Sequence, residues 1–208
     1  MIKGTPELIS ERREEIINAC ETLYQTMSFK EITLKEISGI TSFSRPTIYN
    51  YFQTKEEIFL SLFEREYDRW NEALEGILES SGQHSKAQLA EMISRSLADR
   101  KQLLKLLSMN NYDMEANSRR EMLTSFKTSY GRSMQLIRSI LEKYRPEMTA
   151  EEVRNFIYIF FPFMFGIYPY AEVTEKQHAA MDEAGVGYVD HSIFELTYNC
   201  LISLLNDK

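Results

Sequence analysis

The spacing of apolar residues constrains this chain more than any other feature. Apolar side chains recur every three to four residues over long stretches, as on the core-facing side of an α-helix. No stretch shows a convincing alternation with a period of two, which half-buried strands require. The first stretch predicts a helix from about Pro6 to Met27, and the sequence as a whole predicts an all-α fold.

Several predicted helices begin with a serine or threonine that is followed three residues later by glutamate. Such a pair can satisfy backbone N–H groups that have no partner within the helix. The pairs are Thr33 with Glu36, Thr54 with Glu57, Ser118 with Glu121, and Thr149 with Glu152. Polar segments at residues 80–85 and 184–187 separate helical stretches and are predicted loops.

The order of these helices predicts two domains. Three helices fit into residues 1–54, and the long helix after Thr54 leads into a larger helical region. The chain has 208 residues, of which 43% are hydrophobic, so it can form a sizeable core. We therefore expect a first domain over residues 1–54 and a second over residues 55–208.

The overall charge limits how this chain could bind nucleic acid. The net charge is -7 at pH 7, so the protein has no general attraction to polyanions and needs a local basic patch. Residues 28–55 contain four basic and two acidic residues, namely Lys30, Lys35, Arg45 and Lys55 against Glu31 and Glu36. This local excess of +2 gives only modest support to a nucleic-acid site.

The two cysteines and the apolar content suggest the compartment. Cys20 and Cys200 lie at apolar helical positions and outside any CxxC motif, which favours buried free thiols in a reducing environment. Residues 1–13 lack an apolar signal core, and no stretch reaches the roughly 18 apolar residues of a spanning helix. We expect a cytoplasmic protein with no membrane span.

The segment from Thr33 to Lys55 predicts two short helices joined by a tight turn. Leu34, Ile37 and Ile40 form an apolar side of the first of them. Ser44 is a suitable N-cap for the next helix, and Pro46 fits its first turn, where a missing N–H costs nothing. Two short helices with such a turn are the arrangement of a helix-turn-helix unit.

The second helix of this unit would bury Ile48 and Phe52. That leaves Arg45, Thr47, Tyr49, Asn50 and Tyr51 exposed. Arginine can bond guanine edges, asparagine can bond adenine, and hydroxyl groups can reach phosphate oxygens. Lys55 would add a cation at the start of the following helix. Helix-turn-helix arrangements also occur in helical bundles that bind no DNA, so these residues alone leave both readings open.

At these residues the sequence resembles the TetR family of bacterial regulators. The resemblance covers about the first 65 residues, and it rests on Phe29 to Ile37, Ser44 to Phe52 and Lys55 to Phe59. The Tyr-x-Tyr-Phe-x-x-Lys pattern within it is quite specific. The resemblance implies a sequence-specific DNA-binding regulator, with repression as the family tendency and no cofactor.

The resemblance also implies roles for single residues. Positions that commonly face bases are matched by Arg45, Pro46, Tyr49 and Asn50. Positions that commonly hold the phosphate backbone are matched by Thr33, Thr47, Tyr51 and Lys55; Lys35 could do either, and Ser44 completes the candidate DNA-binding set. The family turn usually holds a glycine where this chain has Ser42, so we expect some strain there.

Family members are dimers that bind palindromic operators, since one short recognition helix reads too few bases. Two copies about 34–36 Å apart reach successive major grooves. The resemblance implies dimerisation through the last two long helices, at about residues 149–170 and 192–205. The candidate interface consists of Phe156, Phe161, Phe194, Tyr198, Leu201 and Leu205. The alternative is that these side chains fill the core.

The resemblance further implies an effector-binding domain in the C-terminal half. The candidate pocket residues are Leu104, Leu107, Tyr112, Phe126, Tyr130, Phe160, Phe163, Met164 and Tyr168. An apolar pocket with a few hydroxyl groups suits a hydrophobic or aromatic effector. The alternative is that these residues are ordinary core. Pro162 is predicted to interrupt its helix and to allow two packings, through which an effector could release the protein from DNA.

An enzyme and a helical adaptor without DNA are the rival classes. Glu175, His178 and Asp182 could share a helix face, but they more plainly form a solvated surface than a metal site. No Ser/His/Asp order, glycine-rich phosphate loop or paired-carboxylate motif is present. We therefore expect neither an enzyme nor a metal site.

Overall fold

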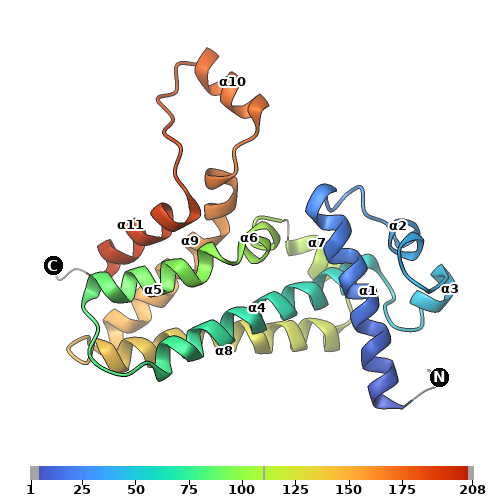
Figure 1. Cartoon of the computed structure of the whole chain (residues 1–208), viewed down its shortest axis with the longest axis horizontal. Helices are drawn as coiled ribbons and strands as arrows, with labels where there is room; N and C mark the ends of the chain where they lie inside the picture. Colours follow the sequence, from blue (N-terminus) through green and yellow to red (C-terminus); the bar gives the residue numbers. More distant parts are fainter. Residues whose placement is uncertain (1–4, 110, 206–208) are drawn as a thin grey trace. The chain divides into compact units, whose positions relative to one another are not determined.

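The structure, a computed structural model, describes residues 5–109 and 111–205, with side chains throughout these ranges except at residues 111–113. The described ranges contain helices and no strand, which confirms the all-α fold (Figure 1). The helices are α1 (Pro6–Thr26), α2 (Leu34–Gly39), α3 (Arg45–Ile48), α4 (Lys55–Glu79), α5 (Lys86–Ala98), α6 (Lys101–Leu107), α7 (Asn111–Ala116), α8 (Arg120–Tyr144), α9 (Ala150–Ala171), α10 (Glu175–Glu183) and α11 (Ile193–Leu205).

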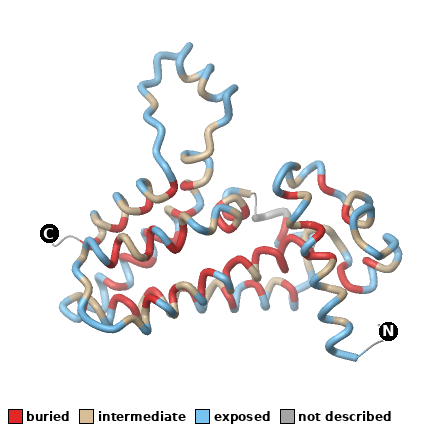
Figure 2. The backbone as a smooth tube through the Cα atoms, viewed as in Figure 1, coloured by how far each residue is buried: buried red, intermediate tan, exposed pale blue. Residues whose placement is uncertain are grey.

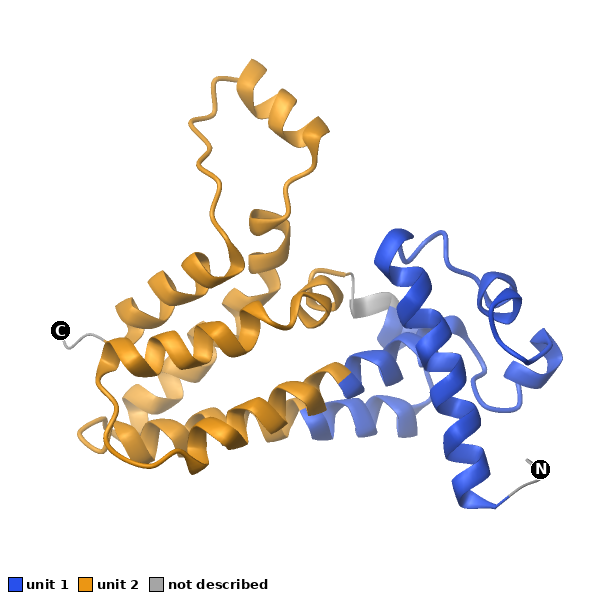
Figure 3. Cartoon of the chain, viewed as in Figure 1, with its two compact units in different colours: residues 1–65, 110–129 blue, residues 66–109, 130–208 orange. Residues whose placement is uncertain are grey.

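The chain divides into two compact units. Unit 1 contains residues 1–65 and 110–129, and unit 2 contains residues 66–109 and 130–208 (Figure 3). The unit with the first three helices therefore extends past residue 54 and includes a segment from the middle of the chain. A functional boundary at residue 54 stays a prediction.

Unit 1 is built around α1 and the beginning of α4. Ile16 and Cys20 on α1, Ile37 on α2 and Ile48 on α3 are fully buried. Phe59 on α4 makes edge-to-face contacts with two rings of this unit, those of Tyr24 and Phe29. The short helices α2 and α3 therefore depend on α1 and α4 for their position.

An arginine of α4 fixes α1 within unit 1. The Arg65 guanidinium donates to Asn18 at 2.6 Å and forms ion pairs with Glu14 at 3.0 Å and Glu21 at 2.8 Å. The three acceptors lie on one side of α1, because they are spaced by four and three residues. The planar fork of arginine suits such a set of acceptors.

Unit 2 holds its own core of packed helices. α5 packs against α11, and α9 packs against α6 and α11. Asn71 on α4 accepts a hydrogen bond from Ser133 on α8 at 2.6 Å, and both side chains are fully buried. A group of aromatic side chains, here called the aromatic cluster, fills the interior. It consists of Tyr67, Trp70, Tyr130, Phe160 and Phe161.

Most predicted helix starts are confirmed, with one exception. α2, α4 and α9 begin directly after Thr33, Thr54 and Thr149, and Thr149 forms a complete capping box with its glutamate. The prediction that Ser118 caps the next helix is wrong, because α8 begins at Arg120 and the Ser118 hydroxyl is buried without a hydrogen-bond partner among the described residues.

Pro162 lies inside α9, which is continuous from Ala150 to Ala171, so the proline does not end the helix, and the kink expected there stays a prediction. Pro162 cannot donate a hydrogen bond to the carbonyl of Tyr158, four residues earlier. Both residues are exposed, so water can satisfy that carbonyl. A proline on the solvent side of a helix is therefore compatible with a continuous helix.

The segment between α9 and α11 forms an excursion from unit 2. α10 lies at its far end, and no residue of α10 is buried (Figures 1 and 2). The segment that returns from α10 to α11 is held by Tyr188, whose hydroxyl donates to the Tyr170 carbonyl, and by the approach of His178 Nε2 to the Asp190 carboxylate at 3.2 Å.

Among the described residues no single helix is long and apolar enough to span a membrane. Only α9 and α10 taken together have that length and composition, and the pair is bent by 86°.

Candidate nucleic-acid interface

The recognition segment, here residues 44–52, is a short helix continued by a turn. α3 itself has four residues, and hydrogen bonds from Tyr49 N to Arg45 O (3.2 Å) and from Phe52 N to Ile48 O (3.0 Å) carry helical geometry to Phe52. Ile48 and Phe52 are fully buried, as predicted. These two side chains anchor the segment, and their spacing of four residues sets which side of it faces outward.

Four predicted base-facing residues lie exposed on this segment. Arg45, Pro46, Tyr49 and Asn50 all face solvent, and the Tyr49 ring is 55% exposed. An exposed aromatic ring beside an arginine and an asparagine is not explained by packing. The group offers a bidentate donor, an amide and a hydroxyl, which are the contacts that base edges in the major groove accept.

Ser44 lies at the N-cap position as predicted, but its side chain does not cap α3. Ser44 occupies the N-cap position, but its hydroxyl makes no capping bond to the backbone and lies 2.9 Å from the Thr47 hydroxyl. Ser44 is exposed and Thr47 half-buried, so this hydroxyl pair lies at the edge of the recognition segment. Both hydroxyls can also bond a phosphate oxygen.

The start of α2 contributes two further exposed candidates. The Thr33 hydroxyl accepts from Lys35 N at 3.1 Å and donates to the Glu36 carboxylate. The capping contacts therefore use the Thr33 oxygen, while the side chains of Thr33 and Lys35 stay exposed. Lys35 is the cation of this group.

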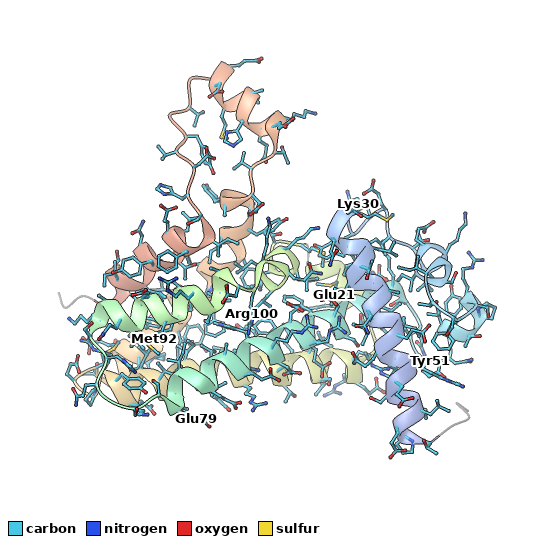
Figure 4. All side chains as sticks on the ribbon, viewed as in Figure 1. Glu21, Lys30, Tyr51, Glu79, Met92 and Arg100 are labelled. Atoms are coloured by element: carbon cyan, nitrogen blue, oxygen red, sulfur yellow. The ribbon has the colours of Figure 1, made fainter. Side chains whose placement is uncertain are left out.

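Tyr51 was expected to be exposed, and that expectation is wrong. The Tyr51 side chain, which is labelled in Figure 4, is 4% exposed. Its hydroxyl accepts a hydrogen bond from Arg12 of α1 at 3.0 Å. The next arginine, Arg13, lies 4.4 Å over the Phe52 ring and donates to the Tyr51 carbonyl at 3.4 Å. Tyr51 is thus turned toward α1, because the helical turn that exposes Tyr49 directs Tyr51 inward.

Lys55 was expected to provide a free cation at the start of α4, and the structure gives it another role. Its ammonium donates to the carbonyls of Phe29 at 2.7 Å and Ile32 at 3.1 Å, and it lies 4.2 Å over the Phe29 ring. These contacts hold the 28–32 turn that leads into α2. The charge is therefore occupied by backbone carbonyls within unit 1.

The turn at Ser42 carries no strain of the kind expected. Among the described residues only Gly82 and Gly185 have a positive φ, so Ser42 does not adopt the left-handed conformation that favours glycine. Its amide donates to the Glu15 carboxylate at 2.6 Å. This hydrogen bond attaches the turn to α1.

A hollow of about 690 Å³ lies along α1 in unit 1. Its carboxylates would repel a phosphate backbone, so we do not assign it to nucleic acid. The hollow is lined by Ser10, Glu11, Glu14, Glu15, Asn18, Ala19, Thr22 and Ile40.

The structure separates the candidate pocket residues. Leu104, Leu107, Phe160 and Met164 are buried in unit 2, whereas Tyr130, Phe163 and Tyr168 are half-buried. Phe126 belongs to unit 1, where it packs on Phe63 with ring centroids 4.8 Å apart, so it is not grouped with the others. The side chain of Tyr112 lies outside the described residues.

Polar groups are present inside the apolar interior of unit 2. The Trp70 indole donates to the Ser96 hydroxyl at 3.0 Å, and Tyr67 and Tyr130 meet edge to face at 5.6 Å. Burial raises the pKa of Tyr67 and of Tyr130, so both phenols remain protonated at neutral pH. The aromatic cluster thus combines large rings with hydroxyl and indole donors.

Four of the six predicted dimer residues are buried within the single chain. Phe156, Phe161, Leu201 and Leu205 belong to the core, and only Phe194 and Tyr198 are half-buried. The large apolar side chains of α9 that do face solvent are those of Tyr158, Ile159, Phe165 and Tyr170. The prediction selected side chains of α9 that face the core instead of solvent. Because α9 is apolar on both sides, its sequence does not indicate which side the rest of the chain covers.

Neither cysteine thiol is activated as a nucleophile. Cys20 is buried, and Cys200 is half-buried with its pKa raised by burial to about 11, so neither is a ready nucleophile. In the part of the chain that the structure describes, no group of three or more His, Cys, Asp or Glu side chains could hold a metal ion.

Comparison with known proteins identifies the family. Residues 64–205 match the family model described as "Tetracyclin repressor-like, C-terminal domain". The chain is 33% identical over 66 residues to YfiR, an HTH-type transcriptional regulator of Bacillus subtilis (strain 168), and 31% identical over 70 residues to the HTH-type transcriptional regulator EthR of Mycolicibacterium smegmatis. These matches cover 32% and 34% of this chain, and 32% of each relative, so the chain matches about a third of their length.

Solved structures share the fold over nearly the whole chain. The fatty acid degradation regulator FadR from Bacillus halodurans has a TM-score of 0.62 at 15% identity, covering 98% of this chain and 97% of that one. FadR of Thermus thermophilus, a TetR family transcriptional repressor solved with lauroyl-CoA, has a TM-score of 0.59 at 20% identity and covers 93% of both chains.

FadR of Bacillus subtilis, solved with stearoyl-CoA, has a TM-score of 0.61 at 16% identity and covers 92% of this chain and 97% of that one. At these identities the likeness concerns the fold. The family match over most of the chain, together with the exposed recognition segment, leads to one conclusion: this protein belongs to the TetR family of DNA-binding transcriptional regulators.

Proposed function

We propose that this regulator binds a palindromic operator as a homodimer, and that it is a repressor released by a small hydrophobic or aromatic effector. The observation that carries the proposal is the recognition segment itself. Arg45, Tyr49 and Asn50 are exposed together on a segment that Ile48 and Phe52 anchor in the core. Arg45 would bond guanine, Asn50 would bond adenine, and Thr33 and Lys35 would contact phosphates.

The dimer follows from the length of the recognition segment and from α9. A segment of nine residues reads only a few base pairs, so specificity requires a second copy on the next major groove. α9 exposes Tyr158 and Ile159, at 66% and 52%, and also Phe165. Large apolar side chains on one helix are typical of a surface that a second copy covers.

The effector site proposed here is the aromatic cluster of unit 2 together with Leu104 and Met164, which are buried in the same unit. Its rings suit an apolar ligand, and the half-buried hydroxyl of Tyr130 would select its polar end, since the Trp70 indole N–H already donates to Ser96. An effector that favours a state with misplaced recognition segments lowers operator affinity, and operator then lowers effector affinity by the same factor. Lauroyl-CoA and stearoyl-CoA, present in two structural neighbours, are the first probes.

A selection experiment tests the DNA-binding part. A library of random duplexes is enriched on the full-length protein, and affinity is measured by fluorescence anisotropy at several salt concentrations. We expect a two-fold symmetric sequence and an affinity that falls with salt. Replacement of Asn50 or Arg45 by alanine should weaken binding to the selected duplex at least about fivefold, the lower end expected for a lost bidentate base contact.

Lys176, an exposed cation of α10 in unit 2, supplies the matched control. The Lys176→Ala variant should bind the selected duplex like the parent protein. If no duplex is enriched, or if Lys176→Ala and Asn50→Ala have equal effects, the assignment of the recognition segment is wrong. Calorimetry with either acyl-CoA, followed by an operator titration, then tests release.

A further inference from the structure

A segment from the middle of the chain folds as part of the DNA-reading unit. Residues 110–129 belong to unit 1 together with residues 1–65 (Figure 3). The matched family model assigns residues 64–205 to the C-terminal domain, so this segment comes from the C-terminal domain of the sequence although it folds in unit 1. Its loop of residues 117–119 lies immediately before α8, which continues to Tyr144 in unit 2.

The loop holds a buried carboxylate at the start of α4. Glu57 is fully buried, and its two oxygens accept four hydrogen bonds. Three come from Arg119: its backbone N at 3.1 Å, Nε at 2.6 Å and Nη2 at 2.8 Å. The fourth comes from the backbone N of Gln53 at 2.8 Å. One carboxylate therefore connects the loop to the residue that directly follows the recognition segment.

Two further contacts join the loop to the same turn. The Thr54 hydroxyl donates to the Asn117 carbonyl at 2.9 Å and accepts from Glu57 N at 3.3 Å, so one side chain caps α4 and binds the loop. Arg119 Nη2 also approaches the Tyr51 carbonyl at 3.5 Å. The turn of residues 51–54, through which the recognition segment joins α4, is thus held from the 117–119 loop.

These contacts fix the angle between the recognition segment and α4, which follows it in the chain. If Arg119 withdrew, no side chain of residues 51–54 would hydrogen-bond the Glu57 carboxylate, because Gln53 donates to it only from its backbone N. A buried carboxylate without its cation is unfavourable, so it would take up a proton or move toward water. Either event weakens the hydrogen bond from the backbone N of Gln53 and frees the start of α4. A small displacement of that turn would then change which bases the recognition segment contacts.

We propose that Arg119 is a positioning residue for operator binding: through Glu57 it fixes the turn between the recognition segment and α4, and the 117–119 loop is the point at which the C-terminal region controls that turn. The proposal rests on the proposed operator binding and adds a residue that touches no DNA. It makes the loop the element whose state an effector would change.

Hydrogen exchange of the full-length protein tests the positioning without DNA. Exchange is followed by mass spectrometry in the parent protein, in Arg119→Gln and in Arg120→Gln, a matched change at the exposed first residue of α8. We expect amides in residues 49–57 to exchange at least tenfold faster in Arg119→Gln and unchanged in Arg120→Gln. Unchanged protection of residues 49–57 in Arg119→Gln would overturn the proposal. If Arg119→Gln fails to fold, Arg119→Lys replaces it.

DNA binding supplies the second readout, on a duplex enriched by the parent protein. We expect Arg119→Gln to lose at least tenfold affinity for this duplex and less than twofold for a random duplex, since a lost phosphate contact would weaken both. Because Arg119 acts through Glu57, the double variant Glu57→Gln/Arg119→Gln should lose no more than Glu57→Gln alone. Additive losses would overturn the proposal. Failure to enrich any duplex would refute the proposed function, while hydrogen exchange would still decide the positioning.

Discussion

Single residues of the recognition segment differ in role more than their types suggest. Tyr49 and Tyr51 have the same side chain two positions apart, yet Tyr49 is exposed and Tyr51 bonds Arg12 in the interior of unit 1. The Lys55 ammonium likewise donates to backbone carbonyls within unit 1. A side chain of this kind contributes to stability, and a loss of DNA binding on its replacement would be indirect.

Lys55 gives the sharpest test of that distinction. In Lys55→Met the carbonyls of Phe29 and Ile32 lose a charged donor, so we expect unfolding to become easier by about 1–3 kcal/mol. Urea denaturation measures the change, and Lys30→Met, at an exposed neighbour, serves as the control. The salt dependence of operator binding should stay that of the parent protein. A reduced salt dependence with unchanged stability would instead place Lys55 on a phosphate.

The pH dependence of stability should report on Glu57. Burial acts to raise the pKa of Glu57, but hydrogen bonds from Arg119 and Gln53 outweigh it and leave the pKa below its ordinary value. A lowered pKa contributes stability that is fully present above the ordinary value of the unfolded chain and is lost as the pH falls through the folded value.

Comparison of the parent protein with Glu57→Gln isolates this contribution. The difference in unfolding free energy between them should be largest near pH 7 and should shrink as the pH falls below about 4.5, the ordinary value for glutamate. Chemical denaturation at a series of pH values measures it. A difference that is constant from pH 7 to pH 3 would contradict the assignment.

Among the elements, α4 is a long helix whose C-terminal carbonyls accept hydrogen bonds from the side chains of another helix, α8. Its last turn contains no basic residue, yet carbonyls at that end are satisfied from α8. The Tyr144 hydroxyl lies 3.0 Å from Ile77 O and 2.7 Å from Ser80 O, and Lys143 donates to Leu78 O at 2.6 Å. The α4–α8 pairing therefore includes a cap made by tertiary contact.

Removing the hydroxyl of Tyr144 tests this cap. Tyr144→Phe should destabilise the protein by about 1 kcal/mol, the typical net value of one hydrogen bond. Tyr49→Phe, at a 55% exposed position outside the proposed dimer surface, removes the same group and should have no effect on the thermal midpoint in the absence of DNA. Equal midpoints for the two variants would show that the α4 cap contributes nothing.

At the scale of the whole molecule, the side of α9 that faces solvent decides how two copies can meet. Replacement of buried Leu201 or Phe161 by glutamate would place a charge in the core and unfold the chain, so it cannot report on association. Ile159 is exposed and apolar, and it lies beside Tyr158 on the same helix.

The variant Ile159→Glu should therefore give a folded monomer. We expect a helical far-UV spectrum like that of the parent protein, a halved mass in sedimentation, and operator affinity lowered at least tenfold because one copy reads half a site. Val189→Glu, a comparable change in the excursion between α9 and α11, should keep the parent mass. A dimeric Ile159→Glu protein would exclude this face of α9.

Much of the fold could be predicted from local patterns. α1 ends at Thr26, one residue before the predicted end, and the caps at Thr33 and Thr149 are correct because they involve only neighbouring residues. Of the candidate site, the exposed positions Arg45 and Asn50 were predicted from the spacing of two buried residues. Ser118 failed as a cap, because α8 begins one residue later, at Arg120, and the backbone N of the preceding Arg119 donates to Glu57, 62 positions away.

Sequence alone determined the helical periodicity, the helix-turn-helix segment and the family, because each depends on residues a few positions apart. Only the tertiary structure decided which polar groups bond partners inside the protein. Lys55 bonds the 28–32 turn, Tyr51 bonds α1 and Glu57 bonds Arg119. It also decided which side of α9 is covered. The physical reason is that a charged or aromatic side chain can satisfy itself with any partner within reach, and that partner comes from a distant segment that no local pattern identifies.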